Sequence, residues 1–68
     1  MPSVAVRVQF LDLDSNRTRT RPVDVQFGTS MSDERITEAA ENIVRTWRGA
    51  KDPRATEIYR DGAWKPVP

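Results

Sequence analysis

The sequence of 68 residues contains no cysteine and no histidine. Without cysteine, the chain can form neither a disulfide framework nor a thiolate metal site, and nothing in it indicates an oxidising compartment. Without histidine, it also lacks the commonest general base and the commonest protein ligand of metals. We therefore expect a protein that is not an enzyme and has no catalytic residues, no metal and no cofactor.

Glycine and long apolar runs are also scarce. The three glycines, Gly28, Gly49 and Gly62, stand too far apart to form a phosphate-cradling loop. No stretch approaches the roughly 20 apolar residues that span a bilayer, and residues 1–5 lack a basic segment followed by an apolar run. We expect a cytoplasmic protein without membrane contact, folded as one small domain that comprises residues 1–68.

Two segments alternate apolar and polar residues with the period of a strand that buries one face. The first runs over 4–10 and the second over 23–27, with the polar segment 14–17 between them as a hairpin loop. We expect two antiparallel strands. Because Pro22 cannot donate a ladder hydrogen bond, the second strand should be an edge or should bend there.

Two registers of this hairpin align the apolar rows. One sets Arg7 opposite Asp24 and Asp12 opposite Arg19, so that two pairs of opposite charge form across the strands. A shift by two residues keeps the apolar match but loses the pair of Arg7 with Asp24. The sequence favours the first register.

From Met31 the apolar residues follow the spacing of an amphipathic helix. Ser32 is a natural N-cap, and Gly49 supplies a left-handed stop after Arg48. Glu41 is expected on the solvated face. The apolar stripe comprises Ile36, Ala39, Ala40, Ile43, Val44 and Trp47.

After the helix, residues 50–55 contain a proline and indicate a loop, and two short strands, 56–60 and 63–67, flank a turn. A two-residue turn would set Tyr59 opposite Trp64 and would leave Ile58 without an apolar partner. A three-residue loop pairs Ile58 with Trp64 instead, and we predict this loop.

The expected order is strand, strand, helix, strand, strand, which is an α+β fold with the helix packed on one face of a four-stranded mixed sheet. A right-handed crossover places the second hairpin beside the first strand. This arrangement is β-grasp-like in topology.

Three arginines alternate with threonines in the second strand, which puts Arg17, Arg19 and Arg21 on one face. These arginines alternate in step with Val23 and Val25 and so point to the same face of the strand, which faces the helix. Because a charged side chain cannot be buried without a partner, we expect the arginines to lie beyond the end of the helix. There Asp12 can neutralise Arg19, and Phe10 can lie under Arg21. One interpretation is an edge strand guarded by charge against aggregation, and the other is a ribbon that contacts a phosphate backbone.

The pair Asp12 and Asp14 has two interpretations. The carboxylates share a face and can hold Mg²⁺, or Asp12 pairs with Arg19 while Asp14 begins the turn. The sequence favours the second interpretation.

The sheet face away from the helix is expected to carry Tyr59 among arginines and leucines, a mixture typical of protein interfaces. The other aromatic residues, Phe10, Phe27, Trp47 and Trp64, are expected in the core. That burial, together with a net charge of +1, disfavours nucleic acid.

The sequence therefore predicts a small binding module, an accessory regulator or inhibitor of the kind that includes proteins of phages and mobile elements. The predicted partner is a protein, and the alternative is nucleic acid bound by the arginine ribbon. The sequence leaves open whether the chain forms a homodimer. No small-molecule substrate is expected. The predicted partner-binding residues are Arg7, Leu11, Leu13, Arg17, Arg19, Arg21 and Tyr59.

Overall fold

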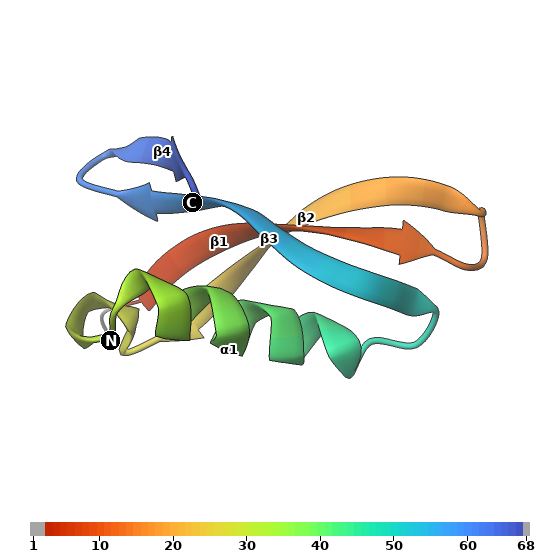
Figure 1. The fold of residues 1–68 in the computed structure, drawn as a ribbon, viewed down its shortest axis with the longest axis horizontal. Coiled ribbons are helices and arrows are strands. Elements are labelled where there is room, and N and C mark those ends of the chain that lie inside the picture. The colour runs from red at the N-terminus through yellow and green to blue at the C-terminus, as the bar shows by residue number, and fades with distance from the viewer. Residues whose placement is uncertain (1–2, 68) are drawn as a thin grey trace.

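The computed structural model describes residues 3–67, in which one helix crosses one face of a four-stranded sheet (Figure 1). Met1, Pro2 and Pro68 belong to the expected domain 1–68 but lie outside the described residues. The elements are β1 (Ser3–Asp12), β2 (Arg17–Gln26), η1 (Gly28–Ser30), α1 (Asp33–Arg45), β3 (Ala50–Arg60) and β4 (Ala63–Pro66). The α+β class is confirmed.

The strand order is β2-β1-β3-β4, and every neighbouring pair is antiparallel, so the expected mixed sheet is wrong. The helix α1 runs the length of the sheet once and returns the chain to the end that carries the first hairpin (Figure 1). From there β3 must run in the direction of β2. Because β3 lies beside β1 and runs in the opposite direction, the two strands pair antiparallel. The β-grasp-like prediction assumed a mixed sheet, so it loses its basis.

The first hairpin adopts the register that the sequence disfavoured. Val6 lies opposite Val23, and Arg7 lies opposite Pro22 rather than Asp24. Apolar rows coincide in either register, so the turn decides between them. As expected, β2 with its proline is an edge strand.

The turn of this hairpin spans residues 13–16, one residue earlier than predicted. The Asp12 carboxylate accepts a hydrogen bond of 3.0 Å from the Asp14 amide, so Asp12 rather than Asp14 begins the turn. At the other end, Asn16 has φ 57°, a left-handed conformation that asparagine tolerates. These two local preferences outweigh one exposed charge pair and fix the register.

The helix begins as predicted, with the Ser32 side chain accepting from the Arg35 amide. It ends at Arg45, earlier than the expected stop at Gly49. Both the amide and the hydroxyl of Thr46 donate to the Ile43 carbonyl, at 3.1 and 2.6 Å, and this tight turn ends the helix.

The core lies between α1 and the sheet. Ile36 and Val44 of α1, with Val6 and Val8 of β1, are the largest side chains that are fully buried. Among residues 3–67, the buried core residues are Val4, Val6, Val8, Phe10, Val23, Val25, Ile36, Ala40, Val44, Ala55 and Ile58.

Phe27 is not part of this core, contrary to expectation. It has φ 61°, begins the 3-10 helix η1 and is 55% exposed. Gly28, which follows, approaches β1 so closely that a Cβ atom there would lie 2.9 Å from the Cβ atom of Val4. The left-handed conformation at Phe27 takes the chain out of the sheet, and the lack of a side chain at Gly28 lets the next residue pass close to β1.

Residues 50–55 belong to β3 rather than to a loop. The pairing of β3 with β1 shifts between Gln9 and Leu11, where Asp52 has φ 52° and Pro53 follows. A bulge tolerates proline because one residue there makes no ladder hydrogen bond. On the helix side, the Ala55 amide donates to the Glu41 carboxylate at 2.9 Å, so Glu41 is not on a purely solvated face.

The second hairpin has a two-residue loop, which corrects the three-residue prediction. Asp61 and Gly62 have φ values of 54° and 77°, the left-handed pair that a type I′ turn requires. Tyr59 is therefore opposite Trp64. Ile58 needs no apolar partner on β4, because it is buried beside Val6 of β1.

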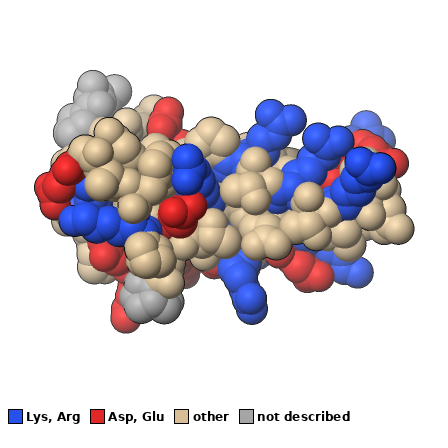
Figure 2. All heavy atoms as spheres, turned by 90° about the horizontal axis from the view of Figure 1, so that it is seen from above, with Lys and Arg blue, Asp and Glu red and all other residues tan. Residues whose placement is uncertain are grey.

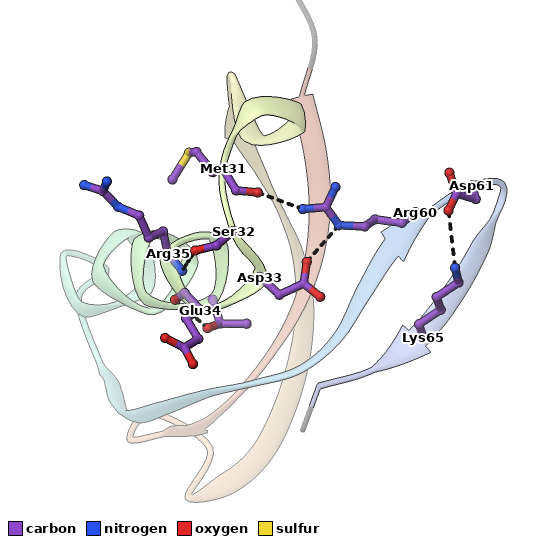
Figure 3. A network of polar contacts seen from close by, with 9 residues as sticks. Met31, Ser32, Asp33, Glu34, Arg35, Arg60, Asp61 and Lys65 are labelled. Atoms are coloured by element: carbon purple, nitrogen blue, oxygen red, sulfur yellow. Dashed lines mark hydrogen bonds and ion pairs between the residues drawn. The ribbon is translucent and has the colours of Figure 1, made fainter.

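Arg60, the last residue of β3, ties the second hairpin to the start of α1 (Figure 3). Its guanidinium donates to the Asp33 carboxylate at 2.9 Å and to the Met31 carbonyl at 3.1 Å. Within the hairpin, Lys65 and Asp61 form an exposed ion pair of 3.3 Å (Figure 3). With these two hydrogen bonds, the Arg60 side chain links the end of β3 to the start of the helix.

Candidate partner-binding surfaces

The predicted partner-binding residues lie on opposite faces of the sheet. Cross-strand partners share a face, and the arginines at 17, 19 and 21 are opposite Asp12, Phe10 and Val8, on the side of the helix. The predicted residues at 7, 11 and 59 have the other parity and lie on the open face. Leu13 lies in the first turn, 55% exposed. The structure therefore divides the predicted site into two surfaces.

On the open face, four side chains of three strands form a group that we call the aromatic cluster: Arg7, Glu57, Tyr59 and Trp64. The guanidinium carbon of Arg7 lies 4.0 Å from the centroid of the Trp64 ring, and its Nη1 atom donates to Glu57 at 2.9 Å. Tyr59 meets Trp64 edge to face, with centroids 5.3 Å apart. Arg7 thus joins a tyrosine, a tryptophan and a carboxylate.

Trp64 and Glu57 are the members that the sequence prediction did not include. The predicted three-residue loop turns the Trp64 side chain toward the helix. The dipeptide Asp61-Gly62 is the signal that identifies the two-residue turn. With Trp64 on the open face, Tyr59 is 43% exposed and has an aromatic neighbour. The cluster is accordingly larger than the sequence indicated.

On the helix side, the chain forms a depression of about 740 Å³, which we call the hairpin groove. It opens because α1 ends at Arg45 and leaves the half of β2 nearest the first turn uncovered: residues 17–22 are exposed, whereas Val23 and Val25 are buried. Its lining includes Phe10, Asp12, Asp14, Arg19, Arg21, Trp47 and Arg48.

Two aromatic rings contribute to the lining of the hairpin groove. Phe10 and Trp47 meet edge to face, with centroids 5.7 Å apart and planes at 89°. Trp47 was expected in the core but is 37% exposed, because the helix ends before it. Phe10 is buried as predicted; within residues 3–67 the cation–π contact is that of Arg7 with Trp64, not that of Arg21 with Phe10.

The cations around the groove differ in their partners. As predicted, Arg19 pairs with Asp12, the Nε and Oδ2 atoms lying 2.8 Å apart. In the part of the chain that the structure describes, Arg17, Arg21 and Arg48 form no ion pair and donate no side-chain hydrogen bond. Arg48 was not identified from the sequence, where it was placed inside the helix. The groove therefore has unpaired positive charge.

The Asp12 carboxylate is committed to the hairpin. The hydrogen bond from the Asp14 amide, with smaller contributions from Ser15 and from the charge of Arg19, holds the pKa of Asp12 below its ordinary value. No group of three or more potential metal ligands occurs within residues 3–67. The pairing of Asp12 with Arg19 is the one that the sequence favoured, whereas the turn is begun by Asp12 and not by Asp14.

Basic groups gather toward the end of the molecule that carries the first hairpin, as Figure 2 shows from above the sheet. No helix within residues 3–67 has the length and apolar character to cross a membrane. No protein-family model, curated protein or solved structure matches the chain.

Proposed function

We propose that the chain is a non-catalytic binding module that contacts a partner protein through its open sheet face. The aromatic cluster is the observation that carries this proposal. Tyrosine, tryptophan and arginine are the residue types that dominate binding energy at protein interfaces. Here all three occur in one group of contacting side chains on the face that the helix leaves uncovered (Figure 1).

The internal contacts of the cluster also support a protein partner. Side chains that hold one another in place lose less conformational entropy when a partner binds. Arg7 is held by both Glu57 and Trp64, with 40% of its side chain still accessible. Leu11 lies further along the same face of β1 and extends the surface toward the first hairpin.

Nucleic acid is the second candidate, and the arginines without an ion pair around the hairpin favour it. Two other features weigh against it. Arg7 covers a face of Trp64 and thereby competes with base stacking. The net charge of +1 also provides little affinity through counterion release. A protein partner therefore remains the first proposal.

The same reasoning supports a role as an accessory regulator or inhibitor, because a protein that only binds its partner acts by changing what that partner does. The lack of cysteine fits a reducing compartment, and we propose the cytoplasm as its location.

Affinity capture from the native source, with mass spectrometry and with or without nuclease, tests the proposal. The bait proteins are the wild type, Tyr59→Ala, Trp64→Ala and Glu38→Ala, the last an exposed helix position that serves as the control. We expect a partner that the wild type and the Glu38 variant retain, that both aromatic variants lose, and that nuclease leaves bound. The proposal would be contradicted if nuclease treatment released the captured partner, or if both aromatic variants captured the partner as fully as the wild type.

A further inference from the structure

The outer edge of β2 is the longest free strand edge of the sheet. β2 spans ten residues, whereas β4 at the opposite edge spans four. Its first half, Arg17–Pro22, is exposed because α1 does not reach it. An exposed edge strand presents unpaired N–H and C=O groups that can hydrogen-bond with an added strand.

Pro22 indicates which backbone groups point outward. A proline is accommodated on an edge strand when its nitrogen faces away from the neighbouring strand. Thr18 and Thr20 have the same parity as Pro22, so we expect their amide and carbonyl groups to point away from β1. A strand added here would pair with Thr18 and Thr20 and would turn alternate side chains toward the hairpin groove.

We propose that an extended acidic segment of the partner protein adds to β2 over residues 17–22 and places its acidic side chains in the hairpin groove. The inference goes beyond the proposed function: it shares the premise of a partner protein but uses the edge of β2 and the helix side of the sheet, not the aromatic cluster. In the lining of the groove, three arginines outnumber two carboxylates, those of Asp12 and Asp14. Asp12 is paired with Arg19, and within residues 3–67 neither Arg21 nor Arg48 forms an ion pair. This excess of positive charge is the reason for an acidic partner. Arginine binds carboxylates through two parallel hydrogen bonds.

The groove also specifies the pattern of the segment. Phe10 and Trp47 provide an apolar part of the lining beside the arginines. Since side chains of a strand alternate between faces, the groove receives every second residue. The complementary pattern is therefore acidic, any, apolar, any, acidic.

A second copy of this chain does not have that chemistry. Two β2 edges paired with each other would bring arginines of like charge together, which is unfavourable. In a second copy, neither β1 nor β3 has acidic side chains at alternate positions, so neither strand has the charges to pair with the edge of β2.

A nucleic acid is also a poorer match to this edge. A phosphodiester backbone offers acceptors but lacks the regular N–H donors that the outward carbonyl groups of β2 require. The peptide backbone offers both, and the edge therefore favours a protein segment.

A synthetic peptide tests the inference. The probe is a blocked seven-residue peptide with Glu at positions 2 and 6, Leu at position 4 and Thr elsewhere, titrated into the ¹⁵N-labelled full chain. We expect saturable binding, with slower hydrogen exchange at the Thr18 and Thr20 amides. Arg21→Glu should weaken binding by about tenfold or more, because it replaces a charge-assisted contact by repulsion. Arg35→Glu, an equal charge change on the exposed helix surface, should change it by less than about twofold.

Three comparisons complete the experiment. An N-methylated form of the peptide, and a form of equal composition with both Glu and the Leu at consecutive positions, should bind at least about tenfold more weakly. Equal binding by the N-methylated form would overturn strand addition. Equal binding by the rearranged form would overturn the alternating contact of acidic side chains with the groove, and absence of binding by the probe would overturn the whole inference. A ten-nucleotide oligothymidylate that bound more tightly than the peptide and depended on Arg21 would overturn the acidic protein segment in favour of nucleic acid.

The result separates this inference from the proposed function. If the peptide fails while capture of a partner still depends on Tyr59 and Trp64, the acidic strand is wrong and the open-face function stands. If the peptide binds while capture is insensitive to both aromatic substitutions, the open-face function is wrong and the edge of β2 is the binding surface.

Discussion

The guanidinium carbon of Arg7 lies 4.0 Å from the centroid of the Trp64 ring, which joins the central strand β1 to the edge strand β4 across β3. β4 is only four residues long and receives no cover from the helix (Figure 1). A short strand of this kind depends on side-chain contacts on its open face. The cation–π contact therefore stabilises the second hairpin and also shapes the proposed binding surface.

A double-mutant cycle on Arg7 and Trp64 tests this coupling. For the single variants Arg7→Gln and Trp64→Leu and for the double variant, urea denaturation gives the free energy of unfolding. We expect an interaction energy of about 0.5–1 kcal/mol, the range for partly exposed cation–π pairs. Arg7→Lys is the matched control because it retains the charge beside Glu57. An interaction energy near zero would show that Arg7 does not stabilise the placement of Trp64.

The close approach of Gly28 to Val4 leads to a second prediction. A Cβ atom at Gly28 would lie 2.9 Å from one side-chain carbon of Val4 and 3.0 Å from another, and Val4 is buried in the core. Gly28→Ala should therefore lower the free energy of unfolding by about 1–3 kcal/mol, the usual cost of overpacking. Thr29→Ala, at the exposed neighbouring position, should change it by less than about 0.5 kcal/mol. Equal stability of the two variants would contradict the steric explanation.

The sequence was sufficient wherever one local signal dominated. The alternation from Val4 to Phe10 and the cap at Ser32 correctly placed β1 and the start of α1. The alternation of the arginines correctly placed Arg19 beyond the helix end, beside Asp12. Each of these predictions depends on residues that are close in the chain or share one strand.

The sequence was insufficient wherever two weak preferences competed. The pairing of Arg7 with Asp24 favours one register and the turn chemistry at Asp12 favours another, and the predicted register differs from the observed one by two residues. In the second hairpin, an apolar partner for Ile58 favours the three-residue loop, against the Asp-Gly turn. That loop turns Trp64 away from the open face, so the sequence identifies Arg7 and Tyr59 but not the other half of the aromatic cluster. In both hairpins the turn residues, which are neighbours in the chain, outweigh a side-chain pairing between the strands.

Glu41 provides a third prediction, because it serves a backbone amide rather than solvent. Its carboxylate accepts the hydrogen bond of the Ala55 amide at 2.9 Å, beside a second register shift of β3 against β1, which lies between Ala55 and Glu57. Glu41→Ala should lower the free energy of unfolding by about 1–3 kcal/mol, since the donor loses its partner in a part-buried position. Glu41→Gln keeps a carbonyl acceptor and should have the smaller effect. Faster hydrogen exchange of the Ala55 amide in the alanine variant alone would locate the loss at this contact.

The lowered pKa of Asp12 gives a prediction for the pH dependence of stability. Its ordinary value is 3.8, and the hydrogen bond from the Asp14 amide is the main cause of the shift. Because the folded state favours the ionised carboxylate, Asp12 contributes stability above its unfolded pKa. That contribution is lost as the pH falls through the lower folded pKa.

Urea denaturation of the wild type, Asp12→Asn and Asp12→Ala from pH 7 to pH 2.5 measures this contribution. We expect the wild type to exceed the asparagine variant by a constant amount above about pH 5, with the difference narrowing as the pH falls below 3.8. The asparagine side chain can still accept from the Asp14 amide, so the alanine variant should be the least stable of the three at pH 7. A difference between wild type and Asp12→Asn that stayed constant down to pH 2.5 would show that the ionised carboxylate does not stabilise the hairpin.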